Sequence, residues 1–141
     1  MSERIGFRGY VTSRPFGGFS IPVPVQSLVL RDYCQRNGLI YVLHANENIF
    51  PHSYLVLEGM IRDLTSYQGI VACSIHMLPQ TVKRRRQVFD AILSQGAEIR
   101  FCLEEILVAD TAGIDRLEEI FSLLDCIRPV TTNLVLDGPD Q

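Results

Sequence analysis

The chain lacks three features that would place it in a special class. It has no excess of positive charge, since its net charge is −3, and this argues against broad binding to nucleic acid, which requires a basic face. No apolar run approaches the roughly 20 residues of a membrane-spanning helix, so we expect no membrane association. No basic segment followed by an apolar one opens the chain, and we therefore expect a cytoplasmic protein without a secretion signal.

Patterns for disulfides, metals and cofactors are also missing. The four cysteines include no Cys-x-x-Cys pair and no His partner at zinc-finger spacing, and we interpret them as reduced thiols. The three histidines, His44, His52 and His76, fall in separate predicted loops with no helical His-x-x-x-His spacing. The segment around Gly17-Gly18 matches neither the dinucleotide fingerprint nor the P-loop. We expect no metal ion and no cofactor.

What the chain does contain is an alternation of short apolar strands with helical patterns. Its 141 residues suit one domain, 1–141. Continuous apolar strands such as Leu39–Leu43 indicate burial on both faces. Pro51 can begin a helix, Thr81 can cap one, and Asp110 or Thr111 can cap a last helix that reaches about Ile127. The expected strands are 5–12, 39–43, 69–75 and 99–103, and the expected helices are 25–37, from Pro51 to about 64, 81–96 and 111–127.

This alternation predicts a three-layer α/β fold with a mostly parallel sheet of four or five strands and helices on both faces. The favoured strand order is flavodoxin-like, 2-1-3-4, which puts a crevice between the first and third strands. Residues 134–136 are left as either a short edge strand or a tail docked on a partner. The basic run Lys83–Arg86 is interpreted as the solvated first turns of a helix.

Polar residues follow each predicted strand, and the fold would gather them at one edge of the sheet. Arg14 could hold a phosphate or carboxylate, although an exposed loop arginine is the plain alternative. His76 could act as a general acid–base group or be a structural loop histidine. Glu47 and Glu104 could serve as acid and base or grip sugar hydroxyls. The expected site comprises the catalytic candidates His76, Glu47 and Glu104 and the ligand-binding candidates Ser13, Arg14, Asn46 and Ser74.

Two stretches resemble the catalytic domain of serine recombinases, the resolvases. The segment Gly9–Ser13 resembles their first strand, and Gly69–Leu78 followed by Gly96–Glu104 resembles a later strand–helix–strand unit. The likeness covers residues 5–105 and implies the fold. The family's Tyr-x-Arg-x-Ser pattern would put an arginine at Thr12 and the nucleophile at Arg14, and its Asp-Arg-Leu-x-Arg pattern falls on residues 76–80. Because these residues are absent, the resemblance argues against strand exchange.

The chain also resembles a small family called sporadic carbohydrate cluster proteins, over residues 9–105. The family takes its name from its place among genes of carbohydrate biosynthesis, so the resemblance implies a pathway rather than a mechanism. The matching segments are Gly9-Tyr10, Ser13–Phe16, Pro24–Gln26, Arg31–Cys34, Leu57-Glu58, Gly69–Val71 and Leu78-Pro79.

Together these observations favour a cytoplasmic enzyme that acts on a sugar, a nucleotide sugar or a similar polar intermediate. The alternative is a non-catalytic binding or accessory protein on a resolvase-like fold, and nucleic-acid binding through Lys83–Arg86 is a weaker third hypothesis. The wide apolar face of the last helix predicts a homodimer or higher homo-oligomer built on residues 111–141.

Overall fold

The computed structural model describes residues 4–18, 20–50 and 52–136, and their side chains as far as Cys126. Its α-helices and strands follow one another as predicted, with one further strand and two short 3₁₀ turns, η1 (Leu64–Ser66) and η2 (Ile75–Met77). In chain order they are β1 (Phe7–Thr12), α1 (Val23–Arg36), β2 (Tyr41–Glu47), α2 (Leu55–Arg62), β3 (Gly69–Ala72), α3 (Val82–Ser94), β4 (Glu98–Phe101), β5 (Ile106–Val108) and α4 (Thr111–Leu136).

The five strands form one sheet in the order β2-β1-β3-β4-β5. The first four are parallel, and β5 runs antiparallel to β4. The predicted 2-1-3-4 order is therefore confirmed, and β1 and β3 are neighbours through pairs such as Tyr10 with Ala72. The crevice at which ligands usually bind in such sheets lies at the carboxyl ends of these two strands.

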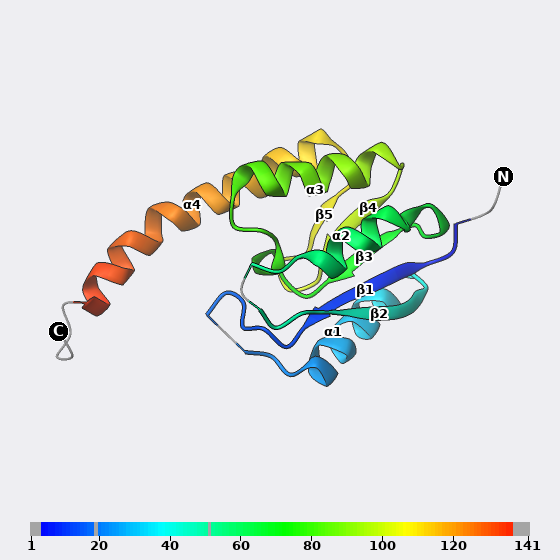
Figure 1. Ribbon diagram of the computed structural model, residues 1–141, viewed down its shortest axis with the longest axis horizontal. Helices are drawn as coiled ribbons and strands as arrows, with labels where there is room; N and C mark the ends of the chain where they lie inside the picture. Colours follow the sequence, from blue (N-terminus) through cyan, green and yellow to red (C-terminus); the bar gives the residue numbers. More distant parts are fainter. Residues whose placement is uncertain (1–3, 19, 51, 137–141) are drawn as a thin grey trace.

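Helices cover both faces of the sheet, as expected. Helix α1 packs on β1 and β2 from one side, while α2 packs on β2 and α3 on β4 from the other side (Figure 1). Helix α4 contacts α3 and β5. Its second half extends well beyond the rest of the molecule in Figure 1. No helix in the described part of the chain combines the length and the apolarity that crossing a membrane would require.

Strand β2 departs from the prediction because it lies at the edge of the sheet. Val42 is 37% exposed and Leu43 is 49% exposed, so the apolar run is not buried on both faces. A run of apolar residues does not reveal whether a strand is central or peripheral. The strand also continues to Glu47, which makes His44–Glu47 part of the strand rather than a loop after it.

Polar side chains help to fix both α1 and α3. In α1 the buried residues are Gln26, Leu30, Tyr33 and Cys34, whereas Leu28 is exposed. Gln26 can be buried because its side-chain amide forms two hydrogen bonds with the backbone of Thr12. Its Oε1 accepts from the N–H at 3.2 Å, and its Nε2 donates to the carbonyl at 2.6 Å. In α3 the predicted Thr81 cap is present, with its hydroxyl accepting from the backbone N–H of Arg84 at 3.3 Å.

The carboxyl-terminal part differs most from the prediction. Strand β5 was not expected, and a tight turn with Glu105 at φ 55° leads into it. Asp110 then caps α4 by accepting from the backbone N–H of Gly113 at 2.9 Å. The helix continues to Leu136, so residues 134–136 form neither an edge strand nor a tail. Pro51 and residues 137–141 lie outside the described part.

Candidate functional site

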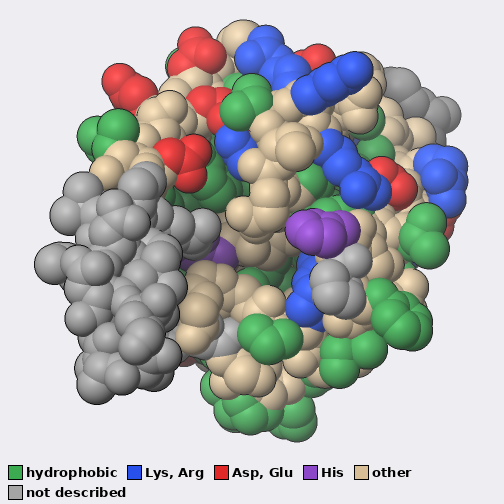
Figure 2. Space-filling view, turned by 60° about the vertical axis from the view of Figure 1, so that its left-hand side comes forward, with side chains coloured by type: hydrophobic (Ala, Val, Ile, Leu, Met, Phe, Trp, Pro, Cys, Tyr) green, Lys and Arg blue, Asp and Glu red, His purple; other side chains and the backbone are tan. Residues whose placement is uncertain are grey.

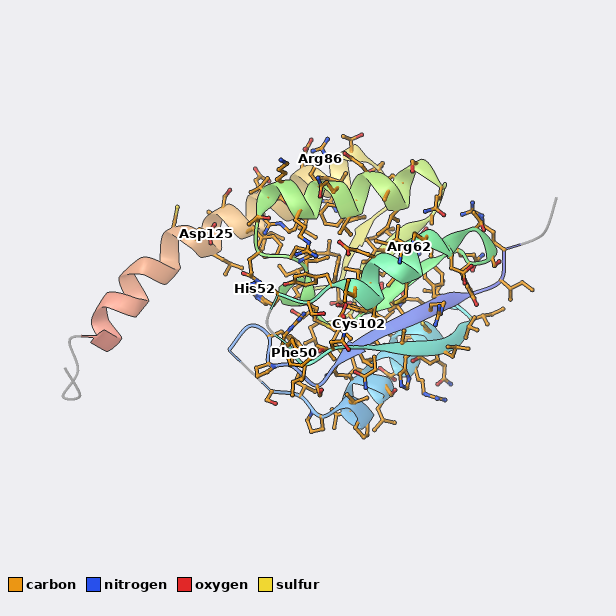
Figure 3. All side chains as sticks on the ribbon, in the orientation of Figure 1. Phe50, His52, Arg62, Arg86, Cys102 and Asp125 are labelled. Atoms are coloured by element: carbon orange, nitrogen blue, oxygen red, sulfur yellow. The ribbon has the colours of Figure 1, made fainter. Side chains whose placement is uncertain are left out.

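A pocket of about 440 Å³ opens where β1, β2 and β3 end. This volume lies within the usual range for small-molecule sites. Figure 3 shows Phe50 and His52 at this end of the molecule, and Figure 2 shows histidine beside Lys or Arg side chains when that end is brought forward. The lining residues come from the three loops that follow the strands: Arg14, Pro15, Phe16, Gly17, Gly18, Ile49, His52, Tyr54, His76 and Gln80.

Arg14 is held firmly at the pocket wall. Its Nη1 donates to the backbone carbonyls of Phe50 (3.1 Å) and Ser53 (2.8 Å), and its guanidinium lies 4.9 Å from the ring centre of Tyr54. No carboxylate of the described residues lies within ion-pair distance of Arg14. The positive charge at the pocket is therefore oriented by the protein but not neutralised, which suits an anionic ligand.

His76 lines the same pocket, so the structure brings together the two residues expected to face each other across β1 and β3. Its ring packs edge-on against Phe121 of α4, with 6.2 Å between ring centres and an interplanar angle of 82°. A Cβ at Gly17 would lie 2.9 Å from the imidazole, and Gly17 has φ 59°. Glycine is therefore required there for both reasons, and it lets the loop close over His76.

Glu47 lies under the pocket rather than in its wall, and it is only 2% exposed. Its carboxylate accepts from the backbone N–H groups of Val56 (3.2 Å) and Leu57 (3.1 Å) in the first turn of α2, and from the hydroxyl of Tyr10 at 2.8 Å. Glu47 thus caps α2 from the end of the preceding strand, β2, because the residue at the N-cap position makes no side-chain cap hydrogen bond. Burial and the nearby Glu47 carboxylate raise the pKa of Tyr10 far above its usual value.

Ser74 and Glu104 contact each other behind His76. The Ser74 hydroxyl donates to Glu104 at 2.6 Å and accepts from the backbone N–H of His76 at 3.1 Å. Glu104 also accepts from the backbone N–H of Ile75 at 3.0 Å. This pair fixes the turn η2, which presents His76 to the pocket.

The remaining expected residues lie outside the pocket wall. Ser13 and Asn46 are both exposed, and Asn46 lies in β2 opposite Val11 of β1. His44 contacts Ser27 of α1 through Nδ1 at 3.1 Å, so the three histidines do not meet. Among the described residues, no group of three His, Cys, Asp or Glu side chains could hold a metal ion.

The sequence did not single out His52, Tyr54 or Gln80 as binding residues. His52 adopts φ 62°, a left-handed conformation that could not be predicted for a histidine from the sequence. Tyr54 carries two guanidinium groups near its ring, those of Arg14 at 4.9 Å and Arg84 at 4.8 Å. Only the three-dimensional meeting of the loops after β1 and β2 with α3 reveals this stack.

The basic run Lys83–Arg86 is mostly neutralised. Arg84 pairs with Glu58 at 3.3 Å and Arg86 with Asp90 at 3.3 Å. Arg85 is buried, only 2% exposed, which corrects the expectation of a wholly solvated run. A run in which the charges are paired or buried offers little attraction for a nucleic-acid backbone.

Two solved structures resemble this fold along almost its whole length. The N-terminal catalytic domain of TP901-1 integrase matches with a TM-score of 0.57 and 17% identity, covering 90% of this chain and 98% of that one. A resolvase family site-specific recombinase from Streptococcus pneumoniae matches with a TM-score of 0.60 and 12% identity, covering 96% and 99%. The sequence itself matches no family model and no curated protein.

These identities establish a common fold and no more. The position at which the resolvase pattern would require the nucleophilic serine is occupied by Arg14, and residues 76–80 carry none of the arginines of the second pattern. The crevice at the carboxyl edge of this sheet holds the pocket that Arg14 and His76 line. The chain therefore has the fold of the resolvase catalytic domain, with a different set of residues at the carboxyl edge of its sheet.

Proposed function

We propose that the protein binds a small polar molecule carrying an anionic group, and that it acts on this molecule as an enzyme of carbohydrate biosynthesis. The proposal rests above all on Arg14, which the backbone orients at the pocket without a neutralising carboxylate. A sugar phosphate or a nucleotide sugar supplies the anion and the hydroxyl groups that such a pocket can bind. The resemblance to sporadic carbohydrate cluster proteins supports the same class of ligand.

In this proposal Arg14 binds the anionic group and His76 transfers a proton. Imidazole titrates near neutral pH and can act in both directions. Glu47 and Glu104 have supporting roles, because their oxygens already accept hydrogen bonds from helix and turn N–H groups. Ser13 and Asn46 lie outside the pocket wall, and in this proposal they take part only if the ligand extends beyond the pocket.

The engagement of both carboxylates also favours a second candidate, a binding or accessory protein without catalysis. An enzyme that relies on acid–base chemistry commonly needs two groups with different proton affinities. Here the pocket wall holds His52 and His76 and no acid. The two candidates share the binding step and differ in whether the bound molecule changes.

Binding should be measured by calorimetry with UDP-glucose, glucose 1-phosphate, inorganic phosphate and glucose. We expect the phosphorylated compounds to bind and glucose alone not to bind. Arg14→Ala should weaken binding roughly 10- to 100-fold, since a charge-assisted pair contributes about 1.5–3 kcal/mol. Arg36→Ala is the matched control, because Arg36 is exposed on α1 and pairs with Asp32. Equal affinities in Arg14→Ala and the parent would refute the proposed site.

Turnover separates the two candidates. The bound compound should be followed by phosphorus NMR with the parent and with His76→Ala. If the protein is an enzyme, His76→Ala retains affinity and loses turnover, as expected of a group that acts in the transition state. If neither protein changes the compound, the binding function remains. Duplex DNA titrated at two salt concentrations tests the nucleic-acid hypothesis, because phosphate contacts weaken steeply with salt.

The proposal includes assembly into a homodimer or larger oligomer through residues 111–141. Leu123 of α4 is 63% exposed, and the helix extends beyond the body of the molecule (Figure 1). Light scattering at tens of micromolar protein is expected to give at least twice the monomer mass, and a monomer would contradict this assembly.

A further inference from the structure

Arg85 is a buried arginine that the proposed chemistry does not use. It lies in the first turn of α3, and its side chain is only 3% exposed. Its guanidinium makes a bidentate contact with Glu118 of α4, with Nε to Oε2 at 2.8 Å and Nη2 to Oε1 at 2.7 Å. This geometry is the strongest form of an arginine–carboxylate pair, and it ties α3 to α4.

The remaining side of the guanidinium holds the loop that precedes α3. Nη1 donates to the backbone carbonyls of Pro79 (3.1 Å) and Gln80 (2.9 Å). Gln80 is one of the residues that line the pocket. The carbonyl of Leu78, in the same loop, accepts from Tyr54, which is also in the pocket wall, at 3.3 Å. Arg85 therefore fixes one wall of the pocket from behind.

Helix α4 reaches the pocket by a second route. The Phe121 ring lies 3.9 Å from the guanidinium carbon of Arg85. The same ring packs edge-on against His76. Glu118 and Phe121 lie one turn apart on α4. This single turn therefore contacts Arg85, which binds the carbonyl of Gln80, and also contacts the ring of His76.

We propose that Arg85, Glu118 and Phe121 form a positioning unit, the α4 bracket, that sets where His76 and Gln80 lie in the pocket. This inference rests on the proposed function for its binding consequence, but its structural content stands by itself. The bracket makes the first half of α4 part of the site, although no described side chain of α4 lines the pocket. Displacement of that turn of α4 would move two walls at once, and a shift of about 1 Å in a binding group is costly.

A double variant distinguishes positioning from simple stabilisation. Replacing both partners of a buried ion pair with apolar residues is often neutral for stability. Arg85→Met with Glu118→Leu should therefore fold, yet it removes the donors to the carbonyls of Pro79 and Gln80. The matched control is Arg86→Met with Asp90→Leu, which removes an exposed pair from the same helix. Phe121→Leu is a second test that keeps the ion pair and removes the ring.

Two measurements are made on each variant. The first is NMR of the His76 imidazole and the Gln80 amide groups, with His76 assigned from His76→Gln. The second is the affinity for glucose 1-phosphate and UDP-glucose. We expect shifted His76 and Gln80 resonances and roughly tenfold weaker binding in the double variant, and unchanged values in the control. In Phe121→Leu the loss of the ring current alone shifts His76, so there we expect a weakened nuclear Overhauser contact between the His76 imidazole and Gly17.

Parent-like resonances and affinity in the folded double variant would overturn the inference. If the parent binds neither compound, the proposed function fails, while the resonances still decide whether the bracket positions the two residues. If the double variant does not fold, Phe121→Leu decides, and a parent-like Overhauser contact between His76 and Gly17 there overturns the inference.

Discussion

Arg14 and Arg85 lie in neighbouring parts of the molecule, and each donates from Nη1 to two backbone carbonyls. Arg85 also meets a carboxylate and a ring on α4 and is buried. Arg14 packs on the ring of Tyr54, meets no described carboxylate and faces a pocket. The comparison shows that hydrogen bonding to the backbone orients an arginine, while the presence or absence of a carboxylate separates a structural arginine from a candidate binding residue.

The largest loss of stability is expected when the ion pair between Arg85 and Glu118 is broken. Arg85→Met alone leaves the carboxylate of Glu118 without its partner and two carbonyls without their donor. We expect a loss of about 3–5 kcal/mol in the free energy of unfolding, measured by urea denaturation. The double variant with Glu118→Leu should recover most of this loss. A single variant as stable as the parent would show that the ion pair contributes nothing.

A second test concerns Glu47, whose buried carboxylate accepts its hydrogen bonds from groups of the protein. Glu47→Ala leaves the hydroxyl of Tyr10 and the first N–H groups of α2 without an acceptor. We expect a loss of roughly 3 kcal/mol in unfolding free energy. Amide hydrogen exchange should increase at Val56 and Leu57 more than in α3, and equal protection in both helices would contradict the capping role.

The third prediction concerns Cys73 and Cys102, two buried thiols that stay neutral, in contrast to the charged groups above. Burial, followed by the nearby Glu104, raises the pKa of Cys73 to about 12 from its ordinary 9.0, and burial raises the pKa of Cys102 as well. Above pH 9 the unfolded chain releases these protons and the folded chain keeps them, so stability falls as pH rises. Each thiol contributes up to about 1.4 kcal/mol per pH unit.

Urea unfolding at pH 7, 8, 9 and 10 measures this slope. Cys102→Ala should reduce it, whereas Cys126→Ser should leave it unchanged, because Cys126 is exposed. A slope that is the same in all three proteins would contradict the assignment.

The smallest change in stability is expected at Arg14, which has no carboxylate partner among the described residues. Arg14→Ala removes two hydrogen bonds at the surface and one contact with Tyr54, so it should cost only about 1 kcal/mol. Urea denaturation beside the calorimetry described above would therefore show large loss of binding with little loss of stability. A cost as large as that of Arg85→Met would place Arg14 among the structural arginines.

The order of the sheet and the presence of Arg14 and His76 in one pocket were predictable from sequence. Both follow from strand–helix alternation and from the rule that places a crevice between the first and third strands. The role of Arg85 was not predictable, because Glu118 lies 33 residues away. In addition, nothing in the run Lys83–Arg86 distinguishes its one buried arginine from its neighbours. The function of Glu47 as a cap of α2 was hidden because Glu47 precedes Val56 by 9 residues, which is outside the local capping pattern. Periodicity indicates local structure, but it does not identify partners that are distant in sequence.

The contact between Gly17 and His76 has a consequence for how this protein can evolve. A side chain at position 17 would meet the imidazole at 2.9 Å on a backbone with φ 59°. In descendants of this chain, a smaller residue at position 76 would remove the steric conflict, but the positive φ would still disfavour most side chains at position 17. Asparagine or aspartate, which tolerate this backbone, should therefore occur at position 17 only in chains where position 76 has lost the histidine.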